Sequence, residues 1–405
     1  MREGRERSLA YLAALRAVRS VSAGIIFVVF PYIAKDVLHL SIFTLGIIYA
    51  TAGAFTAGLS LVVGYMADLL GRKRSLYVAS ALLVVTPLVL LIKVTTLTAF
   101  VSAMLGGISA TGAMGAGGVG GVVGPVQNAI LADLSEGRRR TRLISLLSFL
   151  GSVTAAGGTL IGGYLSYRAE LVLATLIAAA SMALIPLMRL PEVRASSISL
   201  RSARNAMKFS VTGLMNGLTN GLTVPFIIPI FAYIYHAPRS LTSDVVTAAS
   251  LLATFSMLVA PELERRLGFL RSIIITRALT IPLMLAFPFA GSFWLAAALY
   301  LAYPMLRVIA IPVQQSFLLE LTPPDERGRV SGFNQGSRLL FSSVGTFSSS
   351  FFFDAGAGSP VPPMYAAPFM LYAVLTGLNV YLYWAFFSKE EAAVSSRRAV
   401  PAISE

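Results

Sequence analysis

Long apolar stretches recur along the whole chain and are separated by short polar gaps. Each stretch has about 20 residues, which is enough for a helix to cross roughly 30 Å of hydrocarbon. The strands of a membrane barrel would instead alternate in polarity and be about ten residues long. The pattern predicts an all-α membrane protein with twelve transmembrane helices, at 9–34, 42–66, 74–94, 98–131, 142–166, 170–190, 207–234, 243–261, 271–290, 293–321, 330–353 and 364–388.

The composition agrees with a bilayer environment. Hydrophobic residues make up 56% of the 405 residues and charged residues only 12%, whereas a soluble domain carries about 25% charge. Cysteine is absent, which excludes disulfides and thiolate metal sites. The two histidines, His39 and His236, fall in predicted short loops. We therefore expect no metal site and no cofactor.

The 32 Lys and Arg residues are distributed unequally between the two sides of the predicted membrane region. Loops on the side of the termini hold 23, the opposite loops hold four, and the spans hold five. Because positively charged loops stay in the cytoplasm, we expect a multi-pass protein of the cell membrane with both termini cytoplasmic. Most of the positive charge behind the net +14 lies in these short loops between apolar runs, so the expected partners are the lipid bilayer and a small molecule, and not nucleic acid.

The longest polar gap inside the membrane region falls between the sixth and seventh spans and is rich in Ser and Arg. It reads as a linker between two halves. The predicted organisation is an N-terminal six-helix bundle (1–190), a cytoplasmic linker (191–206), a C-terminal six-helix bundle (207–388) and a cytoplasmic tail (389–405).

An internal repeat supports this division. PVQNAILADLSEGRRRTR at 125–142 matches PVQQSFLLELTPPDERGR at 312–329 with a constant offset of 187. Two parallel copies of a six-helix unit explain such a match at fixed register. The polar positions that the copies share are Gln127 and Gln314, Asp133 and Glu320, Arg140 and Arg327, and Arg142 and Arg329.

The loop after the second span reads GYMADLLGRK, at 64–73. It resembles the motif of the major facilitator superfamily, which has Gly, three residues, Asp, a basic residue, one residue, Gly, Arg and a further base. Leu69 stands in the first basic position. The resemblance covers nearly the whole chain, through the twelve spans, the central loop and this motif. It implies two six-helix pseudo-repeats around a central cavity, alternating access, and no enzymatic activity.

The resemblance also implies a conformational latch. In the family, the aspartate that matches Asp68 meets the N-terminus of the eleventh helix, here at 330–331, where the helix dipole favours an anion. The competing interpretation is that the basic residues of this loop only determine topology. The latch residues implied here are Gly64, Asp68, Gly71, Arg72 and Lys73.

Five arginines lie within predicted spans, whereas no acid lies near a midplane. Four of them, at 16, 19, 277 and 338, are near cytoplasmic ends, where they can snorkel, and we interpret them as structural. Arg307 lies about 21 Å into the tenth span. It either contacts substrate or caps backbone carbonyls at a proline break. The cavity candidates are Arg307 with Tyr300 and Tyr303 on its helical face, and Asn216 and Asn220 in the seventh span, whose amides could equally join helices.

These features favour a secondary active transporter that moves a small organic solute by alternating access. The alternatives are a proton-coupled multidrug exporter of the same fold and a non-transporting membrane sensor or scaffold. Such exporters usually have Gly-Pro where Gly158 and Thr159 stand. In-span arginines without acids favour an anionic solute, although a neutral hydroxyl-rich solute fits as well. We expect a monomer; the direction of transport and any coupling ion stay open.

Overall fold

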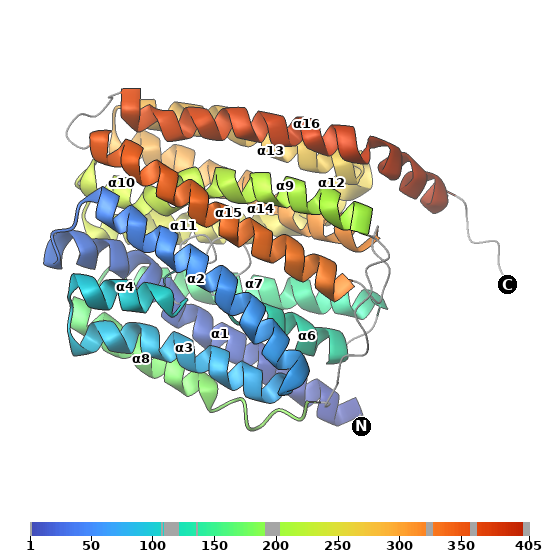
Figure 1. Cartoon of the computed structure of the whole chain (residues 1–405), viewed down its shortest axis with the longest axis horizontal. Coiled ribbons are helices and arrows are strands. Elements are labelled where there is room, and N and C mark those ends of the chain that lie inside the picture. The colour runs from blue at the N-terminus through green and yellow to red at the C-terminus, as the bar shows by residue number, and fades with distance from the viewer. Residues whose placement is uncertain are drawn as a thin grey trace.

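The computed structural model describes residues 2–106, 108, 121–134, 137–190, 203–320, 327–356 and 363–399. All regular structure in this described part is helical, and the helices run side by side along one axis (Figure 1). The start of α1 (Arg2–Tyr32) and the end of α16 (Pro363–Ala399) lie at the same end of the bundle, on the right in Figure 1. We call this the terminus end. The opposite end, which carries the turns at 38–41, 93–95, 162–166 and 234–238, is called the far end.

The N-terminal half occupies the lower part of Figure 1. Its first helix continues at the far end into a π-helical turn, and its last helix is followed by an irregular stretch to residue 190. The helices of this half are α1 (Arg2–Tyr32) with η1 (Ile33–Val37), α2 (Ile42–Leu69), α3 (Arg72–Ile92), α4 (Thr96–Met104), α6 (Gly124–Leu134), α7 (Gly137–Ile161) and α8 (Tyr167–Met182).

The C-terminal half lies above it in the same view. Its seventh span is interrupted by a 3-10 turn that contains Pro225, because proline lacks the N–H that a continuous helix needs. The helices are α9 (Ala203–Thr223), η2 (Val224–Phe226), α10 (Ile227–Tyr233), α11 (Arg239–Ser256), η3 (Met257–Val259), α12 (Ala260–Leu267), α13 (Phe269–Ala286), η4 (Phe287–Phe289), α14 (Phe293–Glu320), α15 (Arg327–Gly356) and α16 (Pro363–Ala399).

Eight helical stretches within the described residues are long and apolar enough to cross a membrane. They coincide with the first three predicted spans, with spans seven to ten and with span twelve. At span six, α8 has only 16 residues, and α15, at span eleven, is rich in serine and glycine. The predicted all-helical membrane class is confirmed. The last helix runs to Ala399, beyond the predicted span end at 388.

The two halves share unusual backbone positions. His39 and His236 both have positive φ, at 52° and 48°, and so do Gly71 and Gly268, at 92° and 80°. Each pair is 197 residues apart, whereas Gln127 and Gln314 are 187 apart. The first half therefore holds ten more residues between Gly71 and Gln127 than the second half holds between Gly268 and Gln314. They fall in the glycine-rich sequence between α4 and α6, most of which lies outside the described residues, where the second half has the single helix α14.

Glycines bring α9 and α15 into close contact, and this contact positions the candidate site. A Cβ on Gly217 would lie 2.1 Å from the carbonyl oxygen of Arg338, and one on Gly221 would lie 2.0 Å from that of Ser342. Only glycine permits such backbone approach. Since α15 also packs on α2 of the other half, it links the two bundles.

A hydrophobic core joins the halves at the far end. Val28, Tyr32 and Ile42 of the N-terminal half belong to the same buried cluster as Phe231 and Tyr300 of the C-terminal half. Outside the bundle, large apolar side chains such as Leu61, Trp294 and Val374 are exposed. This arrangement, with apolar residues both inside and outside, is what a lipid solvent permits.

Candidate functional site

A small polar cavity of about 20 Å³ lies within the C-terminal half. Every residue that lines it in the described part comes from α9, α13, α14, α15 or α16. The lining residues are Asn216, Thr219, Asn220, Arg277, Thr280, Arg307, Ile311, Arg338, Tyr372 and Thr376. Nine of these ten side chains are polar, which is unusual inside an otherwise apolar bundle and marks the cavity as a candidate binding site.

Three arginines from three different helices converge on this cavity. Arg277 of α13 donates to Asn216 Oδ1 and to Gln314 Oε1, at 2.9 Å each. Arg338 of α15 donates to Gln335 Oε1 at 2.8 Å. Both guanidinium groups are thus held by neutral amides. Within the described residues, no carboxylate pairs with either of them or with Arg307.

Two guanidinium nitrogens in this site are buried without a hydrogen-bond partner in the described part: Nη1 of Arg307 and Nε of Arg277. An unsatisfied buried donor is costly, and a charged one more so. The unmatched donors belong to residues that line the cavity, so an acceptor that entered the cavity could satisfy them.

A polar stripe on α16 forms another wall. Tyr372, Thr376, Asn379 and Tyr383 follow one helical face. The Tyr372 hydroxyl is 2.8 Å from Thr280 Oγ1, and Arg277 lies over the Tyr383 ring, 5.1 Å from its centroid. Asn379 is fully buried, and both of its amide atoms lack a partner. This spacing of polar residues in an apolar span was the sequence signal that could have revealed the stripe.

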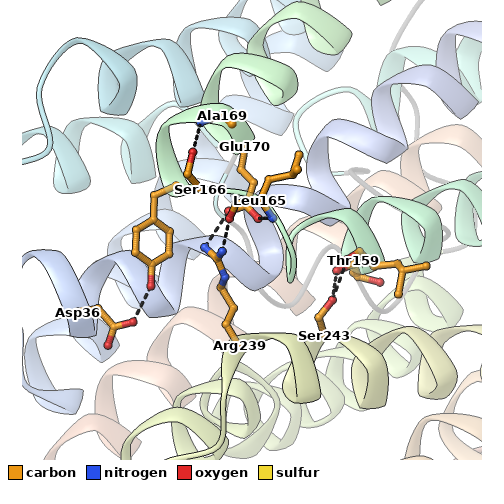
Figure 2. A network of polar contacts seen from close by, with 10 residues as sticks. Asp36, Thr159, Leu165, Ser166, Ala169, Glu170, Arg239 and Ser243 are labelled. Carbon is orange, nitrogen blue, oxygen red and sulfur yellow. Dashed lines mark hydrogen bonds and ion pairs between the residues drawn. The ribbon is translucent and has the colours of Figure 1, made fainter.

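The far end of the bundle is closed by a network that crosses the two halves (Figure 2). Arg239, at the start of α11, pairs through Nη1 with Glu170 Oε2 of α8 at 2.8 Å. Its Nη2 donates to the Leu165 carbonyl, and its guanidinium lies 4.3 Å from the Tyr167 ring centroid. Glu170 is fully buried and also accepts from the Leu165 N–H. The Tyr167 hydroxyl in turn donates to Asp36 Oδ2 of η1 at 2.5 Å.

Further hydrogen bonds extend this closure. The Ser243 hydroxyl of α11 donates to the carbonyl of Thr159 on α7, and the Thr159 and Thr247 hydroxyls are 2.8 Å apart. On the α1 side, the Tyr32 hydroxyl donates to the Ala237 carbonyl at 3.0 Å. Lys35 Nζ donates to the Ala232 carbonyl at 2.6 Å. Contacts from several helices of each half therefore hold the far end shut.

Comparison with protein-family models decides the family. The model of the Major Facilitator Superfamily matches residues 12–208 and again residues 209–403. The chain belongs to the Major Facilitator Superfamily. This facilitator is thus a multi-pass secondary transporter with a small-molecule substrate, in a non-enzymatic family.

Solved structures of other facilitators have the same fold. The D-xylose–proton symporter superposes with a TM-score of 0.73 at 16% identity, over 94% of this chain and 97% of that one. A bacterial homologue of the human lysosomal transporter Spinster, inward-facing and unoccupied, gives 0.72 at 12% identity, over 96% and 98%. The human organic anion transporter TETRAN gives 0.68 at 15%, over 94% and 99%. No curated protein sequence matches this chain.

The structure divides the cavity candidates of this facilitator. Arg307, Asn216 and Asn220 line the cavity, whereas Tyr300 and Tyr303 do not. Both tyrosines are fully buried in the far-end hydrophobic cluster. They do share a helical face with Arg307, but that face passes out of the cavity toward the far end, where aromatic side chains fill the space. The Tyr303 ring lies beside the ring of Tyr372, a lining residue, at 6.1 Å between ring centroids.

Arg277 and Arg338 line the cavity, although the sequence analysis interpreted them as structural. That interpretation measured distance to the nearest helix end. It could not tell which side of the helix faces the bundle interior, where snorkelling is blocked by neighbouring helices.

The motif after the second span is described only in part. Gly71 caps α3 with a φ of 92°, and Lys73 Nζ donates to the carbonyls of Pro186 and Met188 at 2.8 and 3.2 Å. Lys73 therefore ties the end of the sixth span to α3. A Cβ on Gly64 would lie 3.6 Å from Pro125. The Asp68 side chain and those at 330–331 lie outside the described side chains, so the latch stays a prediction.

The repeat glutamines have matching partners. Gln127 accepts a hydrogen bond from Arg19 at 3.1 Å, as Gln314 does from Arg277. In each half the glutamine shared by the two repeats thus binds a guanidinium inside the bundle, although the arginines come from α1 and α13. The other six repeat side chains lie outside the described set: Asp133, Arg140, Arg142, Glu320, Arg327 and Arg329.

Proposed function

We propose that this facilitator carries a small organic solute and that the C-terminal cavity is its binding site. The observation that supports the proposal is a polar cavity whose lining arginines carry buried donors without a partner among the described residues. Such donors destabilise an empty site, because they lose their water without gaining an acceptor. A ligand that supplies acceptors offsets this cost.

Alternating access needs a closure at each end of the cavity. The network of Arg239 and Glu170 closes the far end in this structure. We propose that Asp68 latches the terminus end in the opposite state, against the N-terminus of α15. Rocking of the halves then exchanges one closure for the other around the solute.

We also propose that the terminus end faces the cytoplasm of the cell and the far end faces outward. The support is the distribution of Lys and Arg, with 23 in loops at the side of the termini and four opposite. Positive charge near the ends of spans determines this orientation.

Among the described residues, the lining contains three arginines and no carboxylate. This favours transport of an anionic or neutral organic solute over the export of lipophilic cations, because a cation would need an acidic residue in the cavity to attract it. A sensor or scaffold with the same cavity would bind the solute but would not move it across the membrane.

The test exploits a chain that contains no cysteine. Thr376→Cys places one thiol in the cavity, and Leu378→Cys places one on the exposed side of the same helix. Proteoliposomes are tested for counterflow of carboxylates, phosphate esters, sugars, nucleosides and organic cations. A bulky methanethiosulfonate should abolish transport through Thr376→Cys and spare Leu378→Cys. Undiminished transport in the modified Thr376→Cys protein, or no counterflow of any solute, would contradict the proposal.

A further inference from the structure

We infer that the solute is an organic anion with at least two negative charges, such as a dicarboxylate or a phosphate monoester. This inference rests on the proposed function, in which the cavity is the substrate site. It adds the charge of the substrate and names the three arginines that would bind its charged groups: Arg277, Arg307 and Arg338.

The charge balance of the cavity carries the argument. Three guanidinium groups line one cavity, and their hydrogen-bond partners in the described part are neutral amides. Arginine does not lose its proton at any physiological pH, so the site cannot neutralise itself. A single negative charge would leave two cations uncompensated inside the helix bundle. Two or more negative charges bring the site closest to neutrality.

The donor geometry indicates oxyanions. Guanidinium presents a planar fork that matches carboxylate or phosphate oxygens. Arg277 and Arg338 each have a nitrogen bound to an amide that orients them, whereas Nη1 of Arg307 has no partner in the described part. The guanidinium of Arg307 is therefore the one most available to a ligand, and those of Arg277 and Arg338 are already oriented by their amide partners.

The rest of the cavity suits an organic body. Beside the arginines, Thr219, Asn220 and Thr376 offer neutral hydrogen bonds to the uncharged part of a solute. The charged oxygens of the solute would meet the guanidinium groups while its carbon skeleton and hydroxyls meet these side chains.

A ladder of matched ligands tests the charge directly on the unmodified protein. Succinate, succinamate and succinamide have nearly the same shape and carry two, one and no negative charges. Titration calorimetry should rank them in that order, with about a 10-fold to 100-fold loss for each charge removed. Glycerol 3-phosphate against glycerol and inorganic phosphate separates a phosphate ester from a free ion. Equal affinities along the succinate ladder, together with no preference for glycerol 3-phosphate, would overturn the inference.

Variants then test whether the dianion binds at the arginines of the cavity. Arg307→Gln should lose about 10-fold to 100-fold in affinity for the preferred dianion, and Arg307→Lys should recover part of it, because the charge remains but the fork is lost. Arg271→Gln on α13 is the control, since Arg271 is exposed and does not line the cavity. Elution as a single folded species is checked for each variant. Equal dianion affinity in wild type and Arg307→Gln contradicts the assignment.

The two proposals fail in different ways. If modified Thr376→Cys blocks counterflow of a neutral or cationic solute, the cavity is the transport site and the charge inference is wrong. If dianions bind with the expected ladder but are not transported, the charge inference holds and the proposed function is wrong.

Discussion

At the scale of single residues, glycines determine how the helices around the cavity meet. Gly221 lies so close to the Ser342 carbonyl that a Cβ would be 2.0 Å from that oxygen. The α9–α15 contact brings Asn216, Thr219 and Asn220 of one helix beside Arg338 of the other. A methyl group at this contact would push the two helices apart and distort the cavity between them.

Gly221→Ala should therefore lower stability by about 1–3 kcal/mol, the usual cost of overpacking a tight contact. Gly377→Ala is the matched control, because nothing lies within 4 Å of its Cβ and alanine favours helices. Thermal unfolding followed by detergent size-exclusion measures both. Equal melting temperatures for the two variants would show that the helices adjust without cost.

At the scale of elements, charged side chains hold the loops that precede α3 and α13. α16 continues to Ala399, and its Glu391 Oε1 accepts from the backbone N–H of Leu270 at 2.8 Å. A carboxylate there satisfies an end group of α13 and interacts favourably with its dipole. The first half uses Lys73 at the corresponding loop, bound to carbonyls after α8. The two loops share the positive-φ glycine but are tied down by opposite charges.

Apolar pattern located these elements well because lipid imposes a length on every span. It overlooked the end of α16, where residues past 388 are polar and continue as helix through a contact with another element. Only the comparison of helix positions in the two halves shows that ten extra residues separate α4 from α6.

At the scale of the whole molecule, the two ends of the bundle are expected to close alternately. The Arg239–Glu170 pair joins the halves at the far end, and Glu170 is fully buried there while Arg239 is 16% exposed. Loss of this charge pair should weaken far-end closure by about 1.5–3 kcal/mol. Loss of the proposed Asp68 contact should weaken terminus-end closure by about 0.3–2 kcal/mol.

Glu170→Gln and Asp68→Asn should thus shift the conformational equilibrium in opposite directions. The readout is the rate at which an impermeant thiol reagent modifies Thr376→Cys from each side of the membrane. Glu170→Gln should speed modification from the far side and Asp68→Asn from the terminus side. Glu262→Gln is the control, since its pair with Arg265 is exposed and contributes little. Shifts in the same direction would contradict the two-closure scheme.

The orientation of the whole molecule is tested separately. Single cysteines at Ser197 and Ser202 should react with an impermeant maleimide only after the cells are opened. Cysteines at Ser240 and Ser359 should react in intact cells. The physical reason is the unequal distribution of positive charge between the loops of the two sides. Reversed labelling would show that other features override that bias.

The sequence by itself determined the class, eight of the span positions, the two-fold repeat and the family, because each depends on composition or on local order along the chain. It also located Arg307, whose depth follows from counting along one helix. The tertiary structure decided which side chains share the cavity. Arg277 and Arg338 belong to it because α13 and α15 turn those faces inward, and Tyr300 and Tyr303 leave it because aromatic packing fills their end. It alone revealed the Arg239–Glu170 closure, because those residues are 69 positions apart and meet only when the halves pack together.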